Sequence, residues 1–174
     1  MYKVGEHIVY GTNGVCRVTE IRNSPFDAAD TRLYYVLEPM YDTSNSVIYT
    51  PVENTNVVMR PLITAEYAKS LLERFGEIGL VRVEIEKKRR DTYRALCMTA
   101  DPEQYVSVIK TVASRRAEFR KTRRRLPDLD NDFEHTSRYC LYGELAEVLG
   151  KEKEEIHNMV EELIAGFLNA QSQS

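Results

Sequence analysis

The spacing of apolar residues changes near residue 60, and this change limits the possible folds more than any single motif. Before it, β-branched and aromatic residues occur in short runs that turn signals separate. After Pro61, apolar residues recur every three or four positions, as they do in amphipathic helices. The sequence therefore predicts an α+β protein, with a small β domain over residues 1–61 and an all-α domain over residues 62–174.

The β domain is expected to contain short antiparallel strands, over residues 7–10, 15–22, 32–37 and 46–50. Asn13 and Gly14 supply the backbone freedom that a tight turn between the first two strands requires. About five such strands bury an apolar face best when they curl, so we expect a small barrel of the SH3-like or Tudor-like type. Residues 52–60 are expected to form a loop, because the flanking prolines cannot donate to a strand ladder.

About five helices are expected in the all-α domain, over residues 64–75, 85–98, 101 onward, 133–149 and 152–168. Asp101 is the expected N-cap of the third helix, and Pro102 occupies its first position. Arg116 and Arg123 share the apolar face of this helix. The helix therefore either projects beyond the core or ends near Arg120.

A polar connector is expected between the third and fourth helices. Pro127 breaks the helical pattern, and three aspartates follow it: Asp128, Asp130 and Asp132. The segment lacks the glycine and the glutamate that a calcium loop carries at its sixth and twelfth positions, which favours a solvated linker. Residues 169–174 are expected to form a frayed tail.

Charge is segregated along the all-α domain. Residues 82–125 contain about fourteen lysines and arginines and about six acidic residues, whereas residues 126–174 contain about three and about eleven. The net charge of -3 hides this separation. Phosphate binding depends on a local basic surface and not on the total charge, so the basic part is a candidate for contact with nucleic-acid backbone. The alternative is a solvated helix face that the acidic C-terminal helices neutralise.

The sequence gives little support for an enzyme. The three histidines, His7, His135 and His157, lie outside any recognisable motif, and no P-loop, nucleophile-elbow or zinc-protease signature is present. The cysteines at positions 16, 97 and 140 lack disulfide or zinc-ligand spacing and are expected to be reduced and buried. With no signal peptide and no long apolar run, we expect a cytoplasmic protein without cofactor, metal, membrane partner or small-molecule substrate.

Several stretches resemble the CarD/CdnL-type bacterial transcription regulators. Residues 3–10 (KVGEHIVY), followed by Gly14 and Val15, are similar to the opening of that family's Tudor-like domain. Residues 34–37 (YYVL) and 48–54 (IYTPVEN) resemble two of its strands. The helical part matches more loosely, at residues 88–90, 99–101, 108–115, 137–138 and 144–146.

This resemblance implies a barrel that docks on the β subunit of RNA polymerase and a helical domain that contacts promoter DNA. The DNA contact would fall near the upstream edge of the bubble, where it would modulate open-complex stability and associate the protein with the nucleoid. The implied polymerase-facing residues are Arg22, Val47, Ile48, Tyr49 and Thr50. The implied DNA-facing residues are Lys87, Lys88, Arg89, Arg90, Arg123, Arg124 and Arg138.

The chain departs from the family at two of these positions. The family often places a tryptophan wedge before its Arg-Arg pair, whereas this chain has no tryptophan and Lys87 stands near that position. An ammonium group offers less apolar surface to a distorted base step, so backbone contact is expected to persist while bubble stabilisation weakens. Tyr49 stands where the family often has arginine, which predicts a more apolar polymerase interface.

Two other functions remain open from the sequence. The first is a general nucleic-acid or ribosome-associated binding protein. The second is a polymerase-binding adaptor without direct DNA contact, in which Glu144, Glu147 and Glu161 would neutralise the basic residues.

Overall fold

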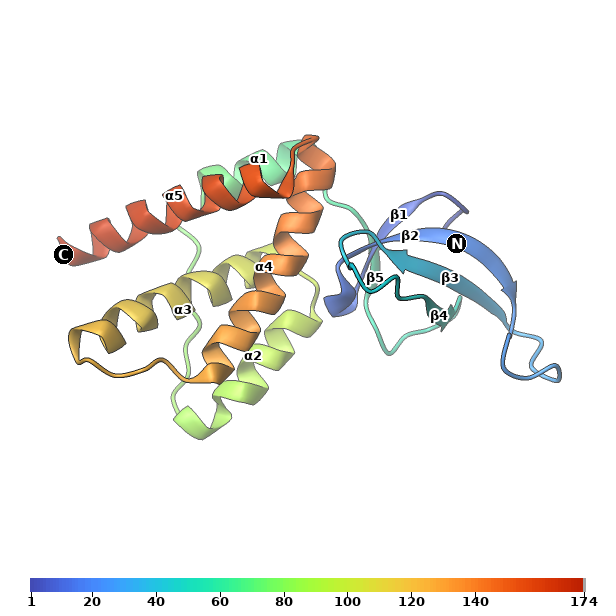
Figure 1. The fold of residues 1–174 in the computed structure, drawn as a ribbon, viewed down its shortest axis with the longest axis horizontal. Coiled ribbons are helices and arrows are strands. Elements are labelled where there is room, and N and C mark those ends of the chain that lie inside the picture. The colour runs from blue at the N-terminus through green and yellow to red at the C-terminus, as the bar shows by residue number, and fades with distance from the viewer. Residues whose placement is uncertain (174) are drawn as a thin grey trace.

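The computed structural model describes residues 1–173, which form a five-stranded sheet followed by five α-helices (Figure 1). The strands are β1 (His7–Tyr10), β2 (Val15–Asn23), β3 (Leu33–Pro39), β4 (Ile48–Pro51) and β5 (Met59–Pro61). They lie in the order β4-β3-β2-β1-β5, and every neighbouring pair is antiparallel. The predicted α+β class is confirmed.

The sheet is open, which corrects the predicted barrel. Within the described residues, β4 pairs only with β3 and β5 pairs only with β1, so the two outer strands do not meet. β5 also lies in the segment that we expected to be a loop. Pro61 fits into this strand because β5 is an edge strand, where the missing N–H leaves no ladder bond unmade.

The helices are α1 (Ala65–Glu73), α2 (Arg89–Met98), α3 (Pro102–Lys121), α4 (Asp128–Leu149) and α5 (Lys153–Ser172), and a short 3-10 turn (Glu86–Lys88) precedes α2. The predicted cap of α3 is confirmed, because the Asp101 side chain accepts a hydrogen bond from the backbone N–H of Glu103 at 2.9 Å and Pro102 begins the helix. None of the helices in residues 1–173 combines the length and the apolar character that a membrane crossing requires.

The C-terminal end of α3 resolves the two alternatives that its sequence left open. The helix ends at Lys121, close to Arg120, and does not project further. Arg123 follows in the left-handed region with a φ of 53°, and the N–H of Arg124 turns back to the carbonyl of Phe119 at 2.9 Å. This tight end leaves both Arg123 and Arg124 exposed to solvent.

Two boundaries of the later helices differ from expectation. The predicted polar connector is the first turn of α4, where aspartates interact favourably with the helix dipole. Asp130 in that turn is fully buried, because it accepts bonds from Arg115 and Tyr93. α5 continues to Ser172 through most of the predicted frayed tail, while residue 174 lies outside the described residues.

Apolar side chains gather in two cores, one inside the sheet and one between the helices. The sheet core contains Ile8, Val18 and Leu37. The larger helical core contains apolar side chains from all five α-helices. Cys16, Cys97 and Cys140 are free and buried, as predicted. The two cores correspond to the two parts of the chain that differ in the spacing of apolar residues. The domain boundary at residue 61 stays a prediction.

A lysine lies inside the helical core. Lys110 on α3 is fully buried, and its Nζ donates to the carbonyl oxygens of Phe75 at 2.7 Å, Gly76 at 3.0 Å and Ile78. The ammonium also lies 4.4 Å from the centre of the Phe167 ring. Burial lowers the pKa of this amine. Lys110 therefore fastens the turn that follows α1 onto α3.

Replacing Lys110 by methionine removes the donor for three carbonyl oxygens while it keeps an apolar chain in the core. Because buried carbonyls without donors are costly, we expect Lys110→Met to lower the free energy of unfolding by about 2–4 kcal/mol. Lys69→Met is the matched control, since Lys69 is exposed on α1, and its effect should stay within about 0.5 kcal/mol. Urea unfolding followed by circular dichroism measures both values, and equal values would contradict this role.

Candidate interaction surfaces

The outer edge of β4 is a free strand edge with aromatic side chains beside it. One side of β4 pairs with β3, and in the described residues no strand pairs with the other. An edge of this kind is a template for an added strand. Phe26, from the connection between β2 and β3, is 74% exposed and packs edge-on against Tyr49 at 5.4 Å between ring centres.

The predicted polymerase-facing residues are not equally accessible. Arg22, Val47 and Tyr49 are exposed, and Ile48 packs partly against the sheet core. Thr50 is only 1% exposed, and its hydroxyl accepts a hydrogen bond from Asn54 at 2.9 Å. Thr50 can therefore offer a partner no more than its backbone. Phe26 was not among the residues predicted to face the polymerase. The one feature of the sequence that pointed to it is an aromatic residue within the polar segment between β2 and β3.

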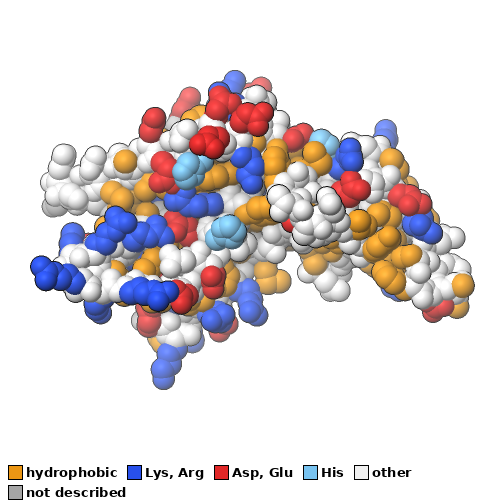
Figure 2. Space-filling model, viewed as in Figure 1, with side chains coloured by type: hydrophobic (Ala, Val, Ile, Leu, Met, Phe, Trp, Pro, Cys, Tyr) orange, Lys and Arg blue, Asp and Glu red, His pale blue; other side chains and the backbone are white. Residues whose placement is uncertain are grey.

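A second exposed surface carries cations at the start of α2 and the end of α3. Figure 2 shows lysine and arginine side chains gathered on the part of the helical half that lies away from the sheet. In residues 1–173, the members of this basic surface form no ion pair, and all are exposed: Lys87, Lys88, Arg90, Arg94, Arg120, Arg123 and Arg124. Five of the seven predicted DNA-facing residues belong to it.

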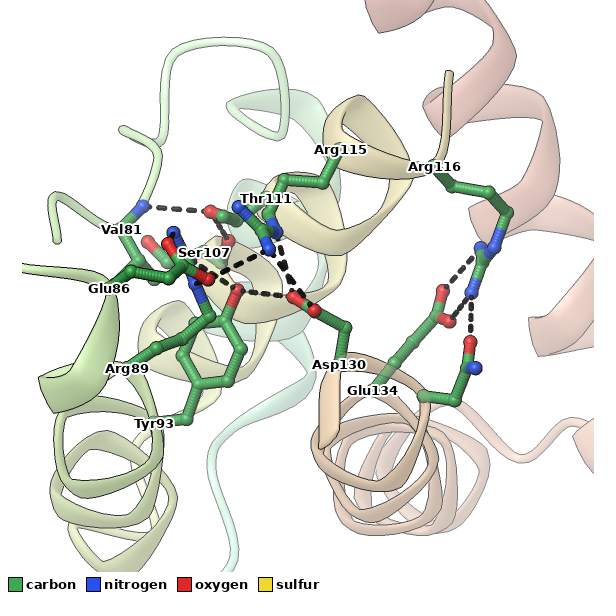
Figure 3. A network of polar contacts seen from close by, with 11 residues as sticks. Val81, Glu86, Arg89, Tyr93, Ser107, Thr111, Arg115, Arg116, Asp130 and Glu134 are labelled. Atoms are coloured by element: carbon green, nitrogen blue, oxygen red, sulfur yellow. Dashed lines mark hydrogen bonds and ion pairs between the residues drawn. The ribbon is translucent and has the colours of Figure 1, made fainter. Parts of the chain in front are cut away.

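Arg89 lies inside the protein and not on the basic surface. It is 6% exposed, and its guanidinium donates to Glu86 at 2.9 Å and to the Tyr93 hydroxyl at 3.0 Å. Arg115 joins the same network by donating to Glu86 and to the buried Asp130 (Figure 3). Burial raises the pKa of Tyr93 to about 12, which keeps this hydroxyl a donor. Arg89 therefore connects to Arg115 on α3 through Glu86 and to Asp130 on α4 through Tyr93.

Arg138 occupies a second internal network. Its guanidinium donates to Glu134 at 2.9 Å, to the Tyr142 hydroxyl and to Glu161. Glu134 is itself buried and also pairs with Arg116. Burial raises the pKa of Glu134, but the hydrogen bonds and charges of Arg116 and Arg138 outweigh it and hold the pKa below its ordinary value. Both arginines are thus occupied within the fold.

The acidic residues that neutralise the basic segment differ from those expected. Glu161 does pair with Arg138, but Glu144 and Glu147 face the sheet. The carboxylates that meet the arginines of α2 and α3 are Glu86, Asp130 and Glu134. Neutralisation is therefore partial, because the basic surface keeps its exposed cations.

An ion pair between a half-buried arginine and a buried glutamate joins the sheet to the helices. The guanidinium of Arg60, on β5, donates to both carboxylate oxygens of Glu144 at 2.5 and 2.7 Å. It also donates to the carbonyl of Ala100, between α2 and α3, at 2.9 and 2.6 Å. Glu144 is 1% exposed and accepts a further bond from the N–H of Ile63. One arginine therefore connects β5, α4 and the turn between α2 and α3.

Further contacts between the sheet and α4 surround this pair. The Nδ1 of His7 lies 2.6 Å from Glu147, and the Tyr41 hydroxyl donates to the same carboxylate at 3.4 Å. The Tyr41 ring packs so closely on Gly143 that a methyl group there would come within 2.9 Å of it. These contacts hold the sheet against the C-terminal half of α4.

The sheet is similar to a class of domains that interact with RNA polymerase. Residues 2–63 match the family model of the CarD-like/TRCF RID domain, and this range covers all five strands. RID domains of this family interact with the polymerase β subunit. The match agrees with a CarD/CdnL-type protein, as the resemblance of the sequence implied. No curated protein matches the chain.

The Arg60–Glu144 pair should contribute strongly to stability. Removing one member leaves a charge with few partners, so we expect Glu144→Met to lower the free energy of unfolding by about 3 kcal/mol. The double variant Arg60→Met plus Glu144→Met should lose less than the sum of the two single variants, because neither charge is then left alone. Chemical unfolding of all four proteins measures the coupling, and strictly additive losses would rule it out.

Proposed function

We propose that this protein is a non-enzymatic regulator of transcription in the bacterial cytoplasm. It binds the β subunit of RNA polymerase through the edge of its sheet and places the basic surface on the backbone of promoter DNA. The DNA contact lies near the upstream edge of the bubble, where it changes the stability of the open complex. The match of residues 2–63 to the RID family carries the polymerase half of this proposal.

The free edge of β4 supplies the physical means for polymerase binding. An extended segment of the partner can add to this edge through main-chain hydrogen bonds. The aromatic pair of Phe26 and Tyr49 then provides a desolvated anchor of the kind that dominates interface energies. Tyr49 stands where the family often has arginine, which makes this anchor more apolar.

The basic surface supports the DNA half of the proposal. Its cations are exposed and unpaired within the described residues, so each can neutralise a phosphate and release a counterion. The expected contact is therefore independent of base sequence. A protein already held on polymerase needs little intrinsic DNA affinity, because the tether raises the effective concentration of the basic surface.

We propose this contact for five of the seven residues that the resemblance implied. Lys87, Lys88, Arg90, Arg123 and Arg124 carry it, whereas Arg89 and Arg138 support the fold from inside. Ile85, which is 53% exposed and precedes Lys87 by two positions, offers apolar surface where the family tryptophan is missing.

A polymerase-binding adaptor without DNA contact is the second candidate. The observation that favours it is the internal pairing of Arg89, Arg115 and Arg116, which removes three cations from the basic residues 82–125. The two candidates differ in DNA binding. Phosphate contacts would make DNA binding weaken as the salt concentration rises, whereas an adaptor would not bind DNA at all.

The polymerase contact is tested by removing the aromatic anchor. We expect Phe26→Ala plus Tyr49→Ala to weaken binding to purified RNA polymerase by about tenfold or more, equivalent to about 1.4 kcal/mol. Leu80→Ala plus Met98→Ala is the control, since both are exposed apolar side chains of the helical half. Surface plasmon resonance with immobilised polymerase compares the three proteins. Unchanged affinity of the aromatic variant would overturn this assignment.

The DNA contact is tested by removing two cations of the basic surface. Lys88→Ala plus Arg90→Ala should bring the lifetime of open complexes back toward the value without the protein, and reduce the salt slope of DNA binding by about 2. Lys3→Ala plus Lys69→Ala removes the same charge from exposed positions elsewhere. If the protein binds polymerase and both variants act on open complexes like the wild type, the adaptor function is correct.

A further inference from the structure

A groove runs between α1 and α5, on a side of the helical half that the proposed function leaves unused. It has a volume of about 400 Å³ and is lined by Leu72 and Glu73 of α1 and by Met159, Glu162 and Leu163 of α5. Figure 1 shows α1 and α5 along one edge of the helical half and α2 along the opposite edge. The groove is therefore separate from the cations at the start of α2.

The floor of the groove is apolar. Leu72, Met159 and Leu163 are only partly buried, and each packs on one side against the helical core. Met159 and Leu163 are one helical turn apart, so they line the groove along its length. The floor suits the apolar stripe of a helix, whose anchors recur with the same spacing.

The rim of the groove is acidic on both sides. Glu73 on α1 and Glu162 on α5 are exposed, and neither forms an ion pair with any residue in positions 1–173. By contrast, the nearby Glu103 and Glu161 are paired with Arg74 and Arg138. Two carboxylates without ion pairs, on the rim of an apolar groove, are complementary in charge to a helix whose apolar stripe is flanked by cations.

A glycine follows the lining residues of the groove along α5. Gly166 lies three and four positions after Leu163 and Glu162, and a methyl group added there would meet no atom within 4 Å. Glycine inside a helix costs about 0.5–1 kcal/mol relative to alanine, so the fold itself does not call for it. The missing side chain leaves open space at this position of α5.

We infer that the groove of α1 and α5 docks an amphipathic helix of a partner protein, with an apolar stripe flanked by lysines or arginines. A second copy of this chain does not offer such a helix, because the stripes of α2 and α3 are buried in their own core, at Tyr93, Cys97, Ile109 and Val112. An anionic membrane surface does not fit either, because the rim carries the same sign of charge.

The inference is tested with a labelled helical peptide of about five turns that carries leucines three and four positions apart and lysines on both flanks. In fluorescence anisotropy, Glu73→Lys plus Glu162→Lys should weaken binding to the full-length protein by about tenfold or more. The same variant should bind a second peptide, with glutamates in place of lysines, better than the wild type does. Gly166→Ala should weaken binding of the first peptide severalfold while it raises the melting temperature.

Glu53→Lys plus Glu84→Lys is the matched control, because both carboxylates are exposed and lie outside the groove. It should bind the lysine peptide as the wild type does. Equal binding by the groove variant and the control would overturn the inference. So would concentration-dependent self-association in sedimentation equilibrium that the groove variant loses, because a second copy would then be the occupant.

Discussion

The ion pair of Arg60 with the buried Glu144 is the interaction on which the arrangement of the whole molecule depends. Arg60 lies on a strand of only three residues, yet its guanidinium reaches α4 and the carbonyl between α2 and α3. A carboxylate that is 1% exposed cannot be hydrated, so it must keep these partners. The sheet and the helices are consequently held in one orientation, and a surface on one bears a fixed relation to a surface on the other.

Buried carboxylates also decide which arginines remain available to a partner. Asp130 and Glu134, in the first turns of α4, draw Arg115, Arg116 and Arg138 into the protein. Each such pair satisfies groups that would otherwise be costly to bury. The cations left over cluster at the start of α2 and the end of α3. A run of like charges along a chain therefore separates in space into a structural part and an exposed part.

Local signals predicted much of this fold. The change in period gave the α+β class, and the Asp101-Pro102 pair located the start of α3. The errors arose from partners that the local sequence does not reveal. Asp130 was predicted to lie in a solvated linker, but Arg115 and Tyr93 bury it by donating hydrogen bonds to its carboxylate. Arg89 was predicted to be exposed, but its guanidinium is bonded to Glu86 and Tyr93. The open sheet could not be predicted either, because Arg60 on β5 bonds to Glu144 and Ala100 in the helical half, and β5 does not pair with β4.

The two edges of the sheet differ in how well they can pair with an added strand. β5 is short, contains Pro61 and directs Arg60 toward the helices, so it is a poor template for another strand. β4 is the other outer strand of the sheet in residues 1–173, so its free edge is the one open to strand addition. The sheet can therefore be extended in one direction, beyond β4, on the side opposite the strand that Arg60 joins to the helices.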